Sequence, residues 1–146
     1  MPSSDEEVTE PAMLKPKRVY PAPRERVMLQ PQARVSLKKG VDTMANLLRV
    51  TLGPRARYVA MERLYRTGDV PEMLDDGATI ARRMIELPNR FENIGAMLVR
   101  HLTWRVGEEA GDGTTTAAVI AQAVLHEATR YVAAGGNPMM LKRGME

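Results

Sequence analysis

The chain has 146 residues, of which 44% are hydrophobic and 27% charged, and a formal net charge of +3. This size and composition fit one domain with a sizeable core, and positive and negative residues are interspersed, so no nucleic-acid partner is expected. The lack of cysteine excludes disulfides and thiolate metal sites, two isolated histidines make a zinc centre unexpected, and no apolar run is long enough to span a membrane.

Residues 1–33 carry six prolines among charged residues, a composition that cannot sustain a helix and buries little surface. We expect this segment to be a largely disordered arm, in which the alternation at 26–29 indicates a short edge strand. Its first residues include Asp5, Glu6 and Glu7 and resemble neither a secretory signal nor a transit peptide, so a cytoplasmic location is expected.

A helix is predicted to begin near Ala33 and to end before Gly53 and Pro54. Apolar residues in this stretch recur every three or four positions, which is the spacing of a helix with one buried face. That face consists of Leu37, Val41, Met44, Ala45 and Leu48.

A β-hairpin is predicted after this helix. The apolar residues at 58–61 indicate the first strand, and the chain is expected to return as the second strand at 72–74, with a turn region at 66–71 between them. The sequence Asp75–Gly77 ends the second strand, and a short helix is expected over 78–85.

Two longer helices are predicted next, each with one apolar face. The first has Pro88 at its first helical position and stops before Gly111, and the second begins near Asp112 and ends at Gly135 and Gly136. The apolar residues that define their inward faces are Phe91, Ile94, Leu98, Leu102 and Val106 in the first, and Ala117, Ile120, Val124, Ala128 and Tyr131 in the second.

A last helix is predicted to have Asn137 as its cap and Pro138 as its first residue. The sequence ends inside this element, with no stop signal after Gly144, so we expect it to be a fragment of a longer protein. The apolar helix faces at 33–52 and 113–132 are therefore expected to lack cover and to promote self-association.

The run Gly111–Thr116 places two glycines, an aspartate and three threonines at the start of a predicted helix. The first turn of a helix has unpaired backbone N–H groups and a partial positive charge, which suit an anion. The glycines let the backbone approach a ligand, Asp112 is a candidate ligand for Mg²⁺, and the threonines can donate to phosphate oxygens. The alternative is that Asp112 or a threonine only caps the helix.

Two further loops carry residues suited to a nucleotide. At Thr51–Pro54 the turn at Gly53 can present backbone amides to phosphates, and at Asp75–Gly77 the carboxylate of Asp76 can orient a water for attack. Taken separately, the two loops are more simply a helix stop and an ordinary turn. Neither a GxxxxGK[ST] loop nor a GxGxxG with an acidic ribose partner is present, so the common nucleotide-binding folds are not indicated.

Five blocks of sequence, in this order, resemble the N-terminal part of the equatorial domain of group I chaperonins, the GroEL type. They are VTLGP at 50–54, DDGATIAR at 75–82, FENIGA at 91–96, AGDGTTTA at 110–117 and AAGGNPMMLKRGME at 133–146. The resemblance runs from about residue 33 to the last residue. It implies a mainly α-helical fold with a small β-hairpin, in which 34–146 form an incomplete equatorial domain preceded by the arm at 1–33.

The resemblance also implies an ATP site. In it Asp112 would bind Mg²⁺, Asp76 would position the hydrolytic water, and backbone oxygens of the loops at Thr51 and Asp75 would help to bind K⁺. The residues that would contact the nucleotide are Thr51, Leu52, Gly53, Pro54, Asp75, Gly113, Thr114, Thr115 and Thr116.

The sequence departs from the family pattern at two places. The family commonly has lysine at the position of Asp75, and a Lys-Gly pair at the positions of Arg55 and Ala56. A carboxylate at Asp75 would repel the γ-phosphate, so reduced nucleotide affinity is expected. The family's apical and intermediate domains and the second half of its equatorial domain have no counterpart in the sequence, and we expect this chain alone to be inactive.

Two functional hypotheses remain. In the first, the chain is part of a subunit of an ATP-dependent protein-folding chaperonin, whose partners are the other subunits of a ring and unfolded client proteins. In the second, it is a non-catalytic assembly or interaction module that reuses the equatorial scaffold. The carboxylate at Asp75, the long arm and the chain length favour the second.

Overall fold

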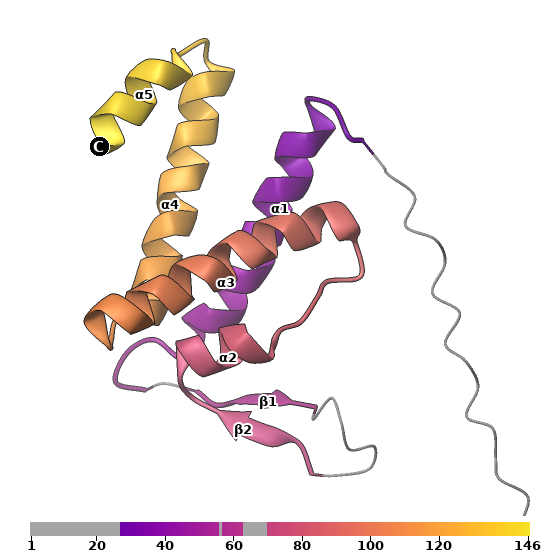
Figure 1. Cartoon of the computed structure of the whole chain (residues 1–146), viewed down its shortest axis with the longest axis vertical. Coiled ribbons are helices and arrows are strands. Elements are labelled where there is room, and N and C mark those ends of the chain that lie inside the picture. The colour runs from indigo at the N-terminus through magenta and orange to yellow at the C-terminus, as the bar shows by residue number, and fades with distance from the viewer. Residues whose placement is uncertain (1–26, 56, 63–69) are drawn as a thin grey trace, which may run out of the picture.

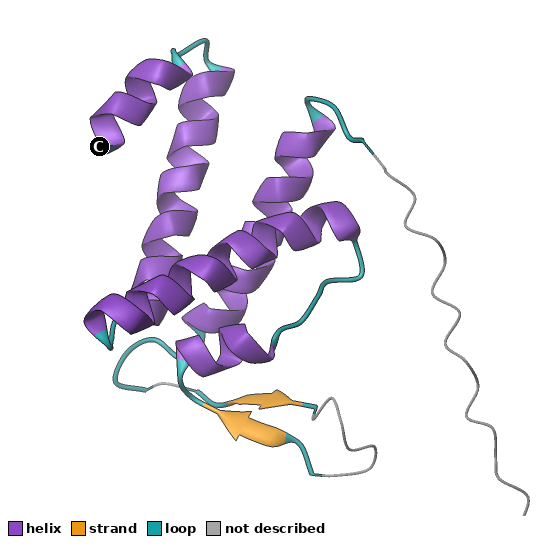
Figure 2. Ribbon diagram, in the orientation of Figure 1, coloured by secondary structure: helices purple, strands orange, loops and turns teal. Residues whose placement is uncertain are grey.

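The computed structural model describes residues 27–55, 57–62 and 70–146. Within these ranges the chain is mainly helical, with five helices and one two-stranded antiparallel sheet (Figures 1 and 2), which confirms the predicted fold class. The elements are α1 (Gln32–Arg49), β1 (Val59–Met61), β2 (Glu72–Leu74), α2 (Gly77–Arg83), α3 (Arg90–Ala110), α4 (Thr114–Ala133) and α5 (Pro138–Met145). No helix in the described ranges is long and apolar enough to cross a membrane.

The predicted arm and the predicted hairpin turn fall mainly on residues that lie outside the described ranges, namely 1–26 and 63–69. The strand predicted at 26–29 is wrong where the structure describes it, because 27–29 form no strand and the only sheet in the described ranges joins β1 to β2. So short a segment gains little as a strand without the hydrogen bonds of a partner. The chain instead enters α1 at Gln32, one residue before the predicted start.

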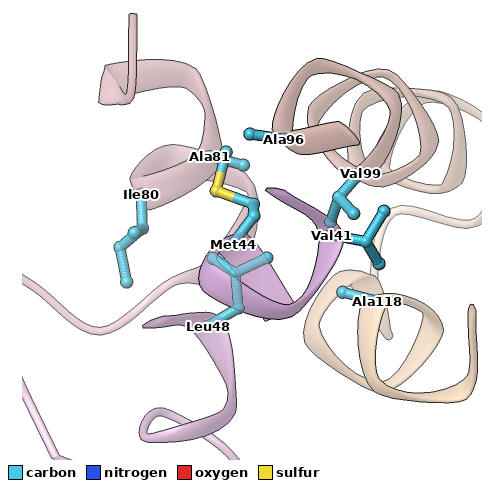
Figure 3. Close-up of a cluster of buried hydrophobic side chains, with 8 residues drawn as sticks. All are labelled: Val41, Met44, Leu48, Ile80, Ala81, Ala96, Val99 and Ala118. Atoms are coloured by element: carbon cyan, nitrogen blue, oxygen red, sulfur yellow. The ribbon is translucent and has the colours of Figure 1, made fainter. Parts of the chain in front are cut away.

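The core lies where α1 meets the other helices. α1 contacts α2, α3 and α4, and α3 crosses in front of α1 and α4 in Figure 1. The predicted inward face of α1 is confirmed, since all of its members are buried except Leu37, which is half-buried. Figure 3 shows the resulting cluster, which consists of Val41, Met44, Leu48, Ile80, Ala81, Ala96, Val99 and Ala118.

The inward face predicted for α3 is wrong at its two best aliphatic positions. Ile94 and Leu98 are each 54% exposed, whereas the side that packs on the core carries small residues. The reason is the short distance between α1 and α3, at which only small side chains fit between the two backbones. The buried residues of α3 are Gly95, Ala96, Val99 and Thr103, and the other predicted members, Phe91, Leu102 and Val106, are half-buried.

The inward face predicted for α4 is wrong at its large residues, because Ile120, Val124 and Tyr131 are exposed, whereas Ala117 and Ala128 are half-buried. The buried residues of α4 are instead Thr114, Ala118 and Gln122, and the half-buried Leu125 also packs against the core. Of the two helix faces expected to lack cover, that of α1 is therefore covered, whereas the large apolar residues of α4 do lie at the surface.

The hairpin and the short helix match their predicted places. β1 pairs with β2 in the register Val59↔Leu74, Ala60↔Met73 and Met61↔Glu72. The side chains alternate, so Val59, Met61 and Leu74 pack against the core while Ala60 and Met73 face outward. The helix predicted over 78–85 forms as α2, and an ion pair of 3.1 Å between Arg83 and Glu72 joins it to β2.

The helix caps show one further correction. Pro88 is not the first residue of α3, because Asn89 is the N-cap and its Oδ1 accepts hydrogen bonds from the N–H groups of Phe91 and Glu92. At the end of the chain the prediction is confirmed, since Asn137 caps α5 and Pro138 is its first residue.

Candidate functional site

The three loops singled out in the sequence meet at one end of the helical layer. They are the segment after α1, the junction of β2 and α2, and the turn between α3 and α4, which lie close together at the lower left of Figure 1. Between them is a cleft of about 200 Å³, lined by Thr51, Leu52, Asp75, Asp76, Gly77, Asp112, Gly113, Thr114, Thr115 and Thr116. The structure thus brings together all the predicted site residues except Gly53 and Pro54, which are exposed in the segment after α1 and do not line the cleft.

The first turn of α4 points unpaired backbone donors at this cleft. Its N-cap is Gly113, with φ 77°, a left-handed conformation that favours glycine, and no side chain caps the helix. The first backbone hydrogen bond of α4 is donated by Ala117 to the oxygen of Gly113, so the three preceding N–H groups have no helical acceptor. The interpretation that Asp112 or a threonine merely caps this helix is therefore wrong.

The carboxylate of Asp112 lies just before this turn. Its Oδ1 accepts a hydrogen bond of 2.6 Å from the N–H of Gly113, and its other oxygen has no protein partner in the part of the chain that the structure describes. The described residues hold no cluster of three or more His, Cys, Asp or Glu side chains able to hold a metal ion. A metal bound to Asp112 would need further oxygens from water or from an anionic ligand, which is how Mg²⁺ is usually held beside phosphates.

The threonine hydroxyls join α1 to α4 at the edge of the cleft. Thr51 Oγ1 donates to the carbonyl of Leu48 at 2.8 Å and lies 3.2 Å from Thr115 Oγ1. Because the one hydroxyl proton of Thr51 is used on Leu48, Thr115 is the donor in the second contact. Gly77 of α2 packs directly on the Thr115 hydroxyl, where a Cβ would clash.

Asp76 lines the cleft and also caps the start of α2. It is the N-cap of α2, accepting from the N–H of Ala78 at 3.2 Å, and from the N–H and hydroxyl of Thr79 at 2.9 and 2.6 Å. Partial burial raises the pKa of Asp76, but these hydrogen bonds and the charge of Arg82 outweigh it, so the pKa lies below its usual value. Asp76 is therefore an ionised acceptor.

A second cavity, of about 260 Å³, adjoins the cleft and shares Asp76, Asp112 and Thr114 with it. Its other walls include Arg82 of α2 and Trp104 of α3, which the sequence did not suggest as site residues. Two features of the sequence could have pointed to these residues. Arg82 lies inside the DDGATIAR block, and Trp104 is the only tryptophan of the chain. Arg82 is the cation nearest in sequence to the cleft carboxylates.

The comparison with known protein families gives a match that spans the cleft. A model of the TCP-1/cpn60 chaperonin family matches residues 44–146, a stretch that contains every residue lining the cleft. The chain belongs to the TCP-1/cpn60 chaperonin family. Membership of this family implies, in general terms, oligomeric assembly and client proteins.

Proposed function

We propose that the chain is part of a subunit of an ATP-dependent protein-folding chaperonin of group I, the GroEL type, and that the cleft binds the phosphates of ATP with Mg²⁺. The observation that carries this proposal is the convergence of three loops, far apart in the sequence, on one cleft beside an uncapped helix start. The N–H groups of that helix start suit an anion, because they are unpaired and carry the positive end of the helix dipole.

The cleft residues divide the task by their chemistry. The N–H groups of the three threonines and the hydroxyls of Thr114 and Thr116 would donate to phosphate oxygens, and Asp112 would hold Mg²⁺ through its unpaired oxygen. Backbone oxygens of the loops at Thr51 and Asp75 would contribute to a K⁺ site. The cleft contains three carboxylates, so a bound cation is needed to offset their repulsion of the phosphates.

Asp76 is the residue that we propose to position the water for hydrolysis. Three hydrogen bonds fix its carboxylate, and its lowered pKa keeps it ionised and able to accept from water. In this proposal the partners are other subunits of a ring and unfolded client proteins, and the location is the cytoplasm.

A second candidate function is a non-catalytic assembly module that reuses this scaffold. The observation in its favour is Asp75, which adds an exposed carboxylate to a cleft that already contains Asp76 and Asp112. If this charge prevents nucleotide binding, only the assembly surfaces of the fold remain.

Calorimetric titration of the chain with ATP and Mg²⁺ separates the two functions. Saturable, Mg²⁺-dependent binding that Asp112→Asn weakens by at least about tenfold supports the first, because asparagine keeps the hydrogen bond to Gly113 and removes only the charge. Glu109→Gln is the matched control, since Glu109 is an exposed carboxylate of α3 that lines neither cavity. Quenching of Trp104 fluorescence would report the same binding, because this ring lines the adjoining cavity. Absence of binding by the chain without substitutions would overturn the first function.

A further inference from the structure

A buried amide joins α4 to α1 away from the cleft. Gln122 of α4 is 5% exposed, and its side chain bonds three residues of α1. Its Oε1 accepts from Arg49 Nη2 at 2.7 Å, and its Nε2 donates to Asp42 Oδ1 at 2.7 Å and to Asn46 Oδ1 at 3.3 Å. Both amide hydrogens and the amide oxygen therefore have partners.

The three partners lie on one face of α1, because their spacing of four and three residues returns to the same side of a helix. One turn further along α4, His126 Nε2 lies 2.6 Å from the same Asp42 oxygen. The contacts then run in opposite chain directions, since Asp42 meets His126 and Arg49 meets Gln122. This places α1 and α4 antiparallel, with Gln122 at the middle of their contact.

The same two helices meet again at the cleft, through Thr51 and Thr115. Thr115 precedes Gln122 by seven residues, which is two turns and about 10 Å along α4. Between these polar contacts the helices meet through Ala118, a fully buried methyl group that packs in the cluster with Val41. A methyl contact limits how close the helices lie but has no direction, whereas the amide of Gln122 makes bonds that a rotation or shift of α4 would break.

We propose that Gln122 is a positioning residue for the cleft. Its hydrogen bonds to one face of α1 fix the position of α4 along its axis and its rotation about that axis. In this position Thr115 contacts Thr51, and the unpaired N–H groups of the first turn line the cleft. This role rests on the proposed function only for its effect on nucleotide binding. Its effect on the first turn of α4 is a property of the chain itself.

The test uses Gln122→Glu in the full chain. Glutamate has the same shape and keeps the acceptor for Arg49, but it puts an oxygen in place of the donor that faces Asp42 and Asn46. Gln32→Glu is the matched control, because it makes the same chemical change at an exposed residue of α1. Gln122→Met, of similar volume and without hydrogen bonds, is the second variant if the charged one does not fold.

Two measurements are made on each variant that melts cooperatively. The N–H of Ala117 makes the first hydrogen bond of α4. Relative to the unmutated chain, amide exchange at Ala117 is expected to become at least about tenfold faster, whereas exchange at the core residues of α3 is expected to change much less. Affinity for ATP with Mg²⁺ is expected to fall at least about tenfold. Adding Asp42→Asn to Gln122→Glu restores a donor opposite the new carboxylate and is expected to recover most of both losses.

Exchange at Ala117 that is as slow in both Gln122 variants as in the unmutated chain would overturn the proposal. A loss of protection spread equally over all helices would also overturn it, because Gln122 would then contribute to stability alone. If the parent chain binds no nucleotide, the proposed function fails, while the exchange measurement still decides the positioning role.

Discussion

Gly40 of α1 and Gly95 of α3 lie at the crossing of their two helices, and each faces the backbone of the other helix. A Cβ added at Gly40 would clash with the carbonyl of Glu92, and one added at Gly95 would clash with the carbonyl of Leu37. Beside this crossing, Lys39 and Glu92 form an ion pair of 2.8 Å. The close approach of α1 and α3 explains why the buried face of α3 carries small residues.

Gly95→Ala is therefore expected to destabilise the fold by about 2–4 kcal/mol, because a backbone carbonyl cannot move aside as a side chain can. Gly107→Ala, on the same helix, is the control. Its Cβ would lie 3.7 Å from Thr114 Cγ2, an ordinary contact, and alanine is the better helix former by about 1 kcal/mol. Urea unfolding of both variants measures the difference, and a Gly95→Ala variant as stable as the parent would contradict the close crossing.

Gly77→Ala is expected to displace the Thr115 hydroxyl, since the new methyl group would occupy its place. We expect a loss of about 1–3 kcal/mol of stability, together with weaker binding of any anion in the cleft. Thr115→Ala removes the clashing hydroxyl, so the double variant should lose less than the sum of the two single changes. A double-mutant cycle by urea unfolding measures this coupling, and strict additivity would show that the two residues do not contact each other.

The Asp42 network predicts a loss of stability in acid. Partial burial raises the pKa of Asp42, but hydrogen bonds from Gln122 and His126 and the charges of His126 and Lys38 outweigh it, so the pKa in the fold lies below the usual value. A carboxylate whose pKa is lowered by folding stabilises the fold at pH values above its pKa in the unfolded chain, about 3.9. This stabilisation is lost as the pH falls through the pKa in the folded chain.

Asp42→Asn should remove this contribution. The difference in urea midpoint between parent and variant is expected to be largest near neutral pH and to shrink below about pH 3.9. Because Asp76 also has a lowered pKa, only the difference between the two proteins isolates Asp42. A difference that stays constant as the pH falls would rule out the network as its cause.

Self-association is expected through the groove between α4 and α5. This groove has a volume of about 620 Å³, and its apolar wall includes Val124, Ala128, Tyr131, Leu141 and Met145. Val124→Lys should weaken association at least about tenfold, because a charge must then be desolvated in the contact. Val35→Lys, at an exposed valine of α1 outside the groove, should have a much smaller effect. Light scattering over a range of concentrations decides, and a parent chain that stays monomeric would contradict this expectation.

Local signals were sufficient for most of the secondary structure. The spacing of apolar residues located α1, the capping residue Asn137 located α5, and the apolar run at 58–61 located β1, because each of these features acts within a few residues. The inward faces of α3 and α4 were predicted wrongly from the same spacing. Which face is buried depends on how closely another helix approaches, and neither the glycine contact at Gly95 nor the amide network of Gln122 is visible within one helix.

The amino-acid sequence by itself determined the family and indicated the three loops of the candidate site, since motifs such as AGDGTTTA are local and keep their order. Only the tertiary structure decided that these loops share one cleft, that the start of α4 is uncapped, and that Asp76 caps α2. The physical reason is that hydrogen bonds and close packing join residues such as Thr51 and Thr115 or Arg49 and Gln122, which are far apart in the chain.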